Sequence, residues 1–217
     1  MDAGILPVKG LGRAKQRLLE RFGDEGRAEI ARALVTDALE LCRQSSGLLS
    51  WWVISDDREV LDLAASYGCR GIQDQADSLN GALGQAVQTV MFEGASSITI
   101  IPADAPMAYV GDLRDLLDTG STSDIVIVPS ERDGGTNALY LRPPDLMEPR
   151  FGTASMQAHV SLAERLGHRC SILILPRLAL DIDTPEDVDA FLRKDKLGTS
   201  NTATVLQRLV AENRESP

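Results

Sequence analysis

The sequence predicts a single α/β domain built on a mostly parallel sheet with helices on both faces. Short apolar runs rich in β-branched residues alternate with amphipathic helical patterns along most of the 217 residues. Parallel strands need a crossover between them, usually a helix, so this alternation is typical of such sheets. A chain of this length can bury roughly 70% of the surface that its unfolded form exposes, so one core is sufficient.

The N-terminal half shows the alternation most clearly. Strands are expected at 3–8, 51–54, 70–73 and 97–102, and helices at 24–42, 58–67, 78–92 and 110–117. The first helix carries Ile30, Leu34, Ala38 and Leu41 at helical spacing, and Ser78 is a candidate N-cap of the third. These elements predict a β-α-β-α-β start.

The C-terminal half adds strands at 125–128, 137–141 and 171–175 and helices at 155–166 and 185–192. The strand at 137–141 is antiparallel to its neighbours if it runs back along the sheet. The remaining residues, 195–217, form a polar linker and a helix with an apolar stripe of Val205, Leu206, Leu209 and Val210. The stripe predicts a cap on the domain or, if exposed, a contact in a homodimer. We therefore divide the chain into a domain at 1–194 and a C-terminal linker and helix at 195–217.

Composition and charge exclude several classes of protein. The net charge of -10 and the pI near 4.7 are wrong for a protein that neutralises a nucleic acid backbone. No apolar stretch approaches the roughly 18 residues of a membrane helix, and no signal-peptide pattern opens the chain. Cys42, Cys69 and Cys170 have no metal-ligand spacing, so we expect reduced thiols in a cytoplasmic protein without nucleic acid or membrane partners.

A loop rich in glycine and basic residues, 7–18, follows the first strand. Its two glycines let the backbone approach a ligand, and Lys9, Lys15 and Arg17 supply the charge that a triphosphate needs. Neither the Walker pattern nor G-x-G-x-x-G is present. The loop is therefore either a solvated basic turn or a phosphate-binding loop.

Three carboxylates stand where an open α/β sheet places its ligands. Asp104 follows the strand at 97–102, and Asp181 and Asp183 lie two residues apart just before the helix at 185–192. Carboxylate oxygens suit Mg²⁺, so together they predict a metal site. The alternative is that Asp104 is a turn residue and that Asp183 or Thr184 only caps the helix.

Two weaker groups complete the candidate site. Thr136, Gly152 and Ser155 lie around the start of the helix at 155–166 and form a plausible cradle for a phosphate or carboxylate, although each fits a turn or a cap equally well. The Asn80 amide is able to recognise a base or ribose, or to bond locally. We interpret His159 as a structural residue rather than a general base.

These motifs together resemble the 2-phospho-L-lactate guanylyltransferase family of deazaflavin coenzyme F-420 biosynthesis, which includes phosphoenolpyruvate and 3-phospho-D-glycerate guanylyltransferases. The resemblance covers nearly the whole chain up to about residue 192, and Gln16 stands where relatives often carry Ser or Thr. The matching segments, in the family's order, are Pro7–Lys9 with Ala14–Leu18, Leu79–Leu83, Pro102–Pro106, Gly135–Leu139, Arg150–Gly152 with Ser155 and His159, and Asp181–Asp187.

The resemblance implies a nucleotidyltransferase domain at 1–194 with a Rossmann-like mixed sheet of the nucleotide-diphospho-sugar transferase, or glycosyltransferase-A-like, architecture. It further implies the following roles: Lys9, Lys15, Arg17 and Asn80 bind GTP, Asp104, Asp181 and Asp183 hold Mg²⁺, Thr136, Gly152 and Ser155 bind the phosphorylated acid, and Lys15, Asp104 and Asp183 are catalytic. The acid's phosphate oxygen would attack the α-phosphorus of GTP and release pyrophosphate.

Two other functions remain open at the level of the sequence. A sugar-phosphate or molybdenum-cofactor nucleotidyltransferase would usually carry a glycine-rich L-x-G-G or A-x-G-x-G-x-R loop after the first strand, which is absent. A non-catalytic nucleotide-binding regulator would have no use for three convergent carboxylates. The sequence does not distinguish the three candidate acids, which differ by features worth roughly 1–3 kcal/mol when read by packing.

Overall fold

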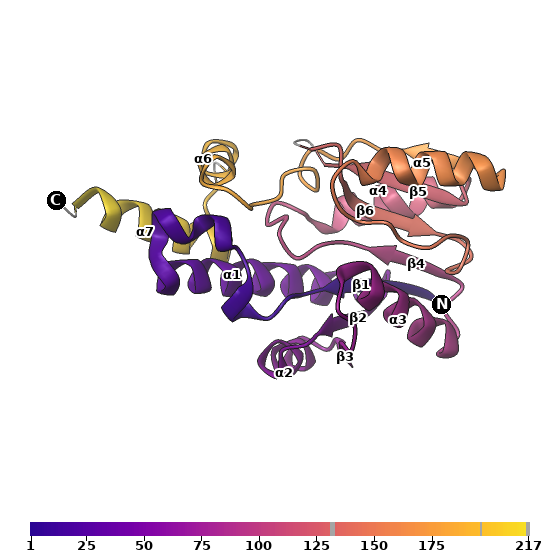
Figure 1. The fold of residues 1–217 in the computed structure, drawn as a ribbon, viewed down its shortest axis with the longest axis horizontal. Coiled ribbons are helices and arrows are strands. Elements are labelled where there is room, and N and C mark those ends of the chain that lie inside the picture. The colour runs from indigo at the N-terminus through magenta and orange to yellow at the C-terminus, as the bar shows by residue number, and fades with distance from the viewer. Residues whose placement is uncertain (131–132, 196, 216–217) are drawn as a thin grey trace.

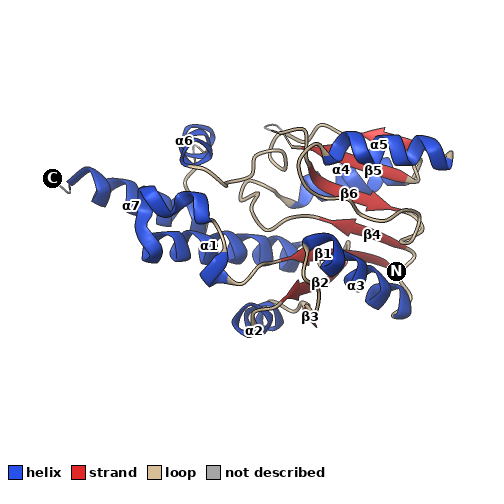
Figure 2. Ribbon diagram, in the orientation of Figure 1, coloured by secondary structure: helices blue, strands red, loops and turns tan. Residues whose placement is uncertain are grey.

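Seven strands form one mixed sheet in the order β3-β2-β1-β4-β6-β5-β7. In this computed structural model, which describes residues 1–130, 133–195 and 197–215, the helices flank the sheet and a helical extension projects from one end of it (Figures 1 and 2). The strands are β1 (Asp2–Pro7), β2 (Ser50–Ser55), β3 (Arg70–Gln73), β4 (Ser97–Ile100), β5 (Ile125–Pro129), β6 (Thr136–Leu141) and β7 (Cys170–Ile172). The predicted mostly parallel sheet is confirmed, because only the pairings of β6 are antiparallel.

Helices cover both faces of the sheet. Apolar residues of α1 (Leu19–Gln44), α2 (Arg58–Ser66) and α4 (Val110–Gly120) pack on one face, and those of α3 (Leu79–Phe92) and α5 (Ser155–Leu166) pack on the other. Two short 3₁₀ turns, η1 (Leu11–Arg13) and η2 (Gln16–Leu18), lie between β1 and α1. Ser78 caps α3 as expected, since its hydroxyl accepts a hydrogen bond from the Gly81 amide at 3.1 Å.

Several element bounds differ from the sequence expectation, among them the assigned start of α1 and the end of β7. The range of α1 starts at Leu19, but Gly23 interrupts it with a non-helical φ of 67° that only glycine adopts readily, so the regular helix begins at residue 24 as expected. The strand expected at 171–175 ends at Ile172, because β7 is an edge strand that pairs with β5 alone. Ile172 and Ile174 are 52% and 66% exposed, so apolar composition there did not indicate burial.

The helical extension is made by the N-terminal half of α1 together with α6 (Pro185–Lys194) and α7 (Asn201–Glu215) (Figure 1). Leu206 and Leu209 of the predicted apolar stripe are buried in this cluster, at 0% and 8% exposure. The stripe therefore packs against the chain's own helices, as the cap interpretation predicts, with Val205 and Val210 half-buried beside it. Within the described residues, no helix is both long and apolar enough to span a membrane.

The antiparallel direction of β6 positions its first residue. Parallel strands β1, β2, β4 and β5 end at the edge of the sheet where β6 begins, so Thr136 lies at the same edge as the loops that follow β1 and β4. Ligands of open α/β sheets bind outside this carboxyl edge. All the candidate functional groups lie along it.

Candidate active site

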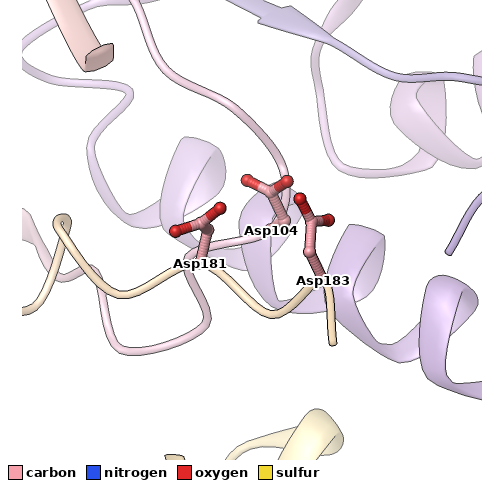
Figure 3. A group of neighbouring side chains, drawn as sticks. All are labelled: Asp104, Asp181 and Asp183. Atoms are coloured by element: carbon pink, nitrogen blue, oxygen red, sulfur yellow. The ribbon is translucent and has the colours of Figure 1, made fainter. Parts of the chain in front are cut away.

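Three carboxylates meet at the carboxyl edge of the sheet, as the sequence predicted (Figure 3). Each of Asp104, Asp181 and Asp183 contributes a carboxylate oxygen, and these three oxygens lie within 4.8 Å of one another. The two segments are joined through the backbone, because the Ile182 amide donates to the Asp104 carbonyl at 3.0 Å. The extended path of 181–183 turns both of its carboxylates toward Asp104, while the Ile182 side chain between them is buried in the helical extension.

The start of α6 holds the Asp183 segment in place. Asp187 accepts hydrogen bonds from the Asp183 amide at 3.0 Å and the Thr184 amide at 2.8 Å, and the Thr184 hydroxyl caps the helix in return. Further back, the buried Asn137 amide donates to the Leu178 carbonyl at 2.9 Å. The sequence left open that Asp183 or Thr184 only caps α6. Thr184 is the residue that caps the helix, and the side chain of Asp183 is directed at the carboxylate cluster.

Lys15 lies against two of the three carboxylates. Its Nζ donates to Asp183 Oδ1 at 2.7 Å and to Asp104 Oδ2 at 3.0 Å, and its side chain is only 11% exposed. Burial alone would lower the pKa of this ammonium, but the attraction of Asp104 and Asp183 and their hydrogen bonds outweigh it, so the pKa is raised. Lys15 therefore stays charged and ties the loop after β1 to the acidic cluster.

The donor set of the cluster suits a divalent cation. Oδ1 of Asp104 is buried and, within the described part of the chain, has no hydrogen-bond partner. An unpaired buried carboxylate oxygen is costly, and a cation supplies the compensation that it lacks. Three carboxylates against one lysine also leave a net negative charge, which hard cations with oxygen ligands prefer.

The loop between β1 and α1 is fixed by side chains outside it. The Gly10 and Leu11 amides donate to Asp56 and Asp57, at 3.2 and 3.1 Å. From the other side the buried Arg27 guanidinium donates to the carbonyls of residues 11, 12 and 14. The loop is therefore a shaped structure rather than the solvated basic turn that the sequence left open.

Two adjoining cavities open along this loop. The first, about 470 Å³, is lined by the loop from Pro7 to Arg17, by Asp104 and Asp183, and by Leu79 and Phe151 on the opposite side. The second, about 540 Å³, lies over the carboxyl ends of β2 and β3 and the start of α3. Lys9 lines both cavities and Arg17 the first, and neither has a carboxylate partner among the residues that the structure describes.

Asn80 lies apart from the cavity walls. Its amide donates to the Phe151 carbonyl at 3.0 Å and its oxygen accepts from the Phe151 amide at 2.8 Å. Asn80 therefore bonds to a distant segment of the chain. The sequence suggested either a local hydrogen bond or contact with a base or ribose, and neither describes this interaction. It fastens the segment around Phe151, whose ring lines the first cavity, to the start of α3.

Thr136 and Ser155 are brought together, but their hydroxyls are buried. Ser155 Oγ donates to Thr136 Oγ1 at 3.1 Å, and His159 Nδ1 bonds to the same oxygen at 3.0 Å. Gly152 is exposed, with a φ of 136° that favours glycine, and its carbonyl accepts from the Ser155 amide. Among Thr136, Gly152 and Ser155, the predicted binding residues for the acid, Gly152 is thus the one that is exposed.

His159 is structural, as the sequence indicated. Its Nε2 accepts from the Arg150 amide at 2.8 Å, so the ring proton sits on Nδ1 and is donated to Thr136. Burial, followed by the charge of Arg150, lowers the pKa of His159 to about 4. A neutral imidazole with both nitrogens occupied has no free position from which to act as a base.

Sequence reasoning missed the residues that position the site: Arg27, Asp56, Asp57 and Asp187. Each is a charged side chain in a helix or helix start that sequence patterns assign to the surface. Two signals were available, namely Asp187 at the third position after Thr184, which is a capping-box spacing, and Arg27 on the apolar side of the first helix.

Comparisons with known proteins agree with this geometry. Residues 2–207 match the family described as "Guanylyl transferase CofC like". The chain is 34% identical over 215 residues to the phosphoenolpyruvate guanylyltransferase of Conexibacter woesei, which covers 96% of both chains. It is 36% identical over 186 residues to the 2-phospho-L-lactate guanylyltransferase of Methanothermobacter thermautotrophicus, covering 85% of this chain and 81% of that one. Against the 3-phospho-D-glycerate guanylyltransferase of Phenylobacterium zucineum, it is 32% identical over 191 residues, with 86% and 88% covered.

A solved structure from Desulfovibrio desulfuricans G20, assigned as a nucleotide-diphospho-sugar transferase, superposes with a TM-score of 0.81 at 19% identity, covering 98% of this chain and 96% of that one. This likeness confirms the predicted nucleotide-diphospho-sugar transferase architecture. The family match, which spans nearly the whole chain, and the identities above 30% establish the relationship: this chain belongs to the CofC-like guanylyltransferase family.

Proposed function

We propose that this chain transfers GMP from GTP to a small phosphorylated carboxylic acid and releases pyrophosphate, as a step of deazaflavin coenzyme F-420 biosynthesis. The observation that carries the proposal is the meeting of Asp104, Asp181, Asp183 and Lys15 beside a cavity of about 470 Å³. The acceptor is 2-phospho-L-lactate, phosphoenolpyruvate or 3-phospho-D-glycerate, the acids named for relatives at similar identity.

The reaction requires positioning and charge neutralisation more than a base. A phosphate oxygen of the acid attacks the α-phosphorus of GTP, the new P–O bond forms, and the bond to the β-phosphate oxygen breaks to release pyrophosphate. Because the second pKa of a phosphate monoester is about 6, the nucleophile is already ionised at neutral pH. This agrees with a site in which Lys15 is held charged and His159 is kept neutral and occupied.

Asp104, Asp181 and Asp183 would hold Mg²⁺. When bound, the cation neutralises phosphate oxygens and helps to align an in-line displacement. Support for this comes from the buried Asp104 oxygen without a partner and from the purely oxygen donor set. Lys15 pairs with two of these carboxylates. When a cation binds the carboxylates instead, the ammonium of Lys15 would be released to bind a phosphate of GTP.

The remaining assignments stay predictions of this proposal. Lys9, Lys15, Arg17 and Asn80 are predicted to bind GTP, and Thr136, Gly152 and Ser155 are predicted to bind the acid. The hydrogen bonds of Asn80 to Phe151 and of Ser155 to Thr136 would let these three side chains act by holding the backbone around the site. The division at residue 194, the cytoplasmic location and the possible homodimer also stay predictions.

Pyrophosphate release from GTP in the presence of Mg²⁺ tests the proposal. Each of the three acids is offered in turn, and the series is repeated with ATP. We expect release that depends on one acid and on GTP. Release with a sugar phosphate in place of these acids would favour the other nucleotidyltransferase class, and GTP binding without release under any condition would favour a regulator.

The metal ligands are tested by substitution. Asp104→Asn and Asp183→Asn keep the side-chain shape but remove charge, and we expect each to lower kcat by more than about 100-fold. Asp62→Asn, an exposed carboxylate on α2, serves as the matched control. Full turnover by both site variants would exclude this metal site.

A further inference from the structure

The two adjoining cavities differ in the charge of their walls. Lys15 and Arg17 line only the first, next to the metal-binding carboxylates. Asp56, Asp74 and Asp77 line only the second, which shares the wall formed by Pro7, Val8, Lys9, Arg13 and Leu79 with the first. A triphosphate is repelled from an acidic wall, so a nucleotide that spans both cavities enters with its phosphates in the first and its uncharged base in the second.

The second cavity has room for a base and a wall that is partly apolar. Its volume, about 540 Å³, falls in the range of small-molecule sites. Several of its walls are apolar, as a planar ring requires for packing against its faces; these are formed by Pro7, Val8, Ile54, Ala76, Leu79 and Ala82. Three of the six polar lining residues are carboxylates, which accept hydrogen bonds and donate none when ionised; the others are Lys9, Arg13 and Ser78.

The three carboxylates of this cavity are not equivalent. Asp56 is occupied, because its oxygens accept from the Gly10 amide and the Arg13 guanidinium. Asp77 is exposed and, among the described residues, no hydrogen bond fixes its side chain. Asp74, directly after β3, is half-buried and oriented by the Ala76 amide, which donates to its Oδ1 at 2.8 Å. Within the described part of the chain its Oδ2 has no partner.

Asp74 therefore offers a fixed carboxylate with most of its acceptor capacity open. A carboxylate has about four lone-pair sites, and the Ala76 amide uses one. Among the common bases, guanine alone presents two adjacent donors, N1–H and the 2-amino group, which match two carboxylate oxygens. Adenine presents its N1 lone pair beside its amino group, so the same carboxylate repels it.

We infer that Asp74 reads the guanine base of the nucleotide, accepting from its N1–H and 2-amino groups, and so sets the preference for GTP. This inference rests on the proposed function, since it concerns the base of the same nucleotide. It assigns the second cavity to the guanosine end of the substrate and the first to the reacting phosphates.

Exchange of the base tests this assignment. Asp74→Asn replaces one acceptor by a donor, so it matches xanthine, which carries an oxygen in place of the 2-amino group. Compared with wild type, we expect the ratio of kcat/KM for XTP to that for GTP to rise by more than about 100-fold. Asp77→Asn is the matched control from the same wall, and its ratio is expected to stay within about twofold of wild type.

Two measurements keep the inference decidable if Asp74→Asn is inactive. Wild-type enzyme assayed with ITP, which lacks only the 2-amino group, should lose about tenfold or more in kcat/KM relative to GTP. Calorimetric titration of GDP and XDP into wild type and Asp74→Asn needs no turnover and should show the same exchange of preference.

The outcomes separate this inference from the proposed function. Wild-type turnover with GTP combined with an unchanged XTP preference of Asp74→Asn, or equal use of ITP and GTP by wild type, would overturn the role of Asp74 alone. A change of preference in Asp77→Asn instead would assign the base to the other carboxylate and also overturn it. Absence of acid-dependent turnover in wild type would contradict the proposed function, while the titrations would still decide whether Asp74 reads guanine.

Discussion

Backbone strain is concentrated at two residues beside the reactive region. Among the described non-glycine residues, Lys15 and Ala154 are those with positive φ, at 54° and 56°. A left-handed conformation costs roughly 1–2 kcal/mol per residue. Lys15 recovers it through two ion pairs with the acidic cluster, and Ala154 precedes α5 next to the proposed acid cradle. Strain of this kind is typical of functional loops, because the surrounding structure must hold them.

At the same scale, His159 gives the fold a dependence on acid. Its pKa is about 4 in the folded chain and near 6.5 when unfolded. Below pH 6.5 the unfolded chain binds a proton that the folded chain refuses, so stability is fully present above that pH and falls until about pH 4. At pH 5 the loss is about 2 kcal/mol.

This loss is measured as the change in unfolding free energy between pH 7 and pH 5 for wild type and His159→Gln. We expect the decrease in the variant to be smaller by about 2 kcal/mol, although the variant is less stable at pH 7. Equal decreases in both proteins would mean that His159 is not held neutral. His168→Gln, in the turn after α5, is the matched histidine control.

At the scale of elements, the loop between β1 and α1 is shaped by a helix that follows it. Arg27, four residues beyond the kink at Gly23, is 4% exposed and reaches back to three carbonyls of the loop, those of residues 11, 12 and 14. Its guanidinium donates to the carbonyls there, so these oxygens are held in place. The planar fork of arginine is needed to reach several carbonyls at once.

Arg27→Lys keeps the positive charge but removes the planar guanidinium with its several N–H donors. We expect the KM for GTP to rise by about tenfold while the protein stays folded, because the loop that receives the phosphates loses its shape. Steady-state kinetics and a thermal unfolding curve measure the two effects. Arg32→Lys, an exposed position on the same helix, controls for the substitution itself. A variant with unchanged KM would show that the loop keeps its shape without Arg27.

At the scale of the whole molecule, the helical extension joins the two ends of the site. α1 begins just after Lys15, α6 begins just after Asp183, and α7 packs on both in one apolar cluster that also contains Leu180 and Ile182. The last helix therefore supports the segments that carry the carboxylates and the lysine, although it lies far from the sheet (Figure 1).

Truncation of a side chain in this cluster tests that role. Leu206 is fully buried, and Leu206→Ala should lower the free energy of unfolding by about 2–5 kcal/mol through lost burial and a cavity. Leu197→Ala, at a residue that is 83% exposed, should change it by less than about 0.5 kcal/mol. Equal effects of the two substitutions in denaturant titrations would contradict the packing of α7.

The sequence predicted the alternation of elements and the convergence of Asp104, Asp181 and Asp183, because periodicity and position relative to strands determine these. The direction of β6 was left conditional, and its pairings with β4 and β5 settle it as antiparallel. The sequence did not predict contacts that depend on three-dimensional proximity. Asn80 bonds to Phe151, 71 residues away, and Arg27 folds back on the loop; neither pattern is periodic. The short helical turn before Gly23 was not predicted, and the predicted length of β7 was wrong, since β7 is an edge strand that pairs with β5 alone.

The proposed activity is transfer of GMP to a phosphorylated acid, as opposed to hydrolysis or mere binding of GTP. The decisive experiment follows GTP labelled at the α-phosphorus, with Mg²⁺ and each of the three acids. We expect the label to move into an acid-dependent product with a diphosphate linkage, and we expect Asp104→Asn to abolish this transfer. Label that stays in GTP, or that appears in free GMP whether or not an acid is present, would contradict it.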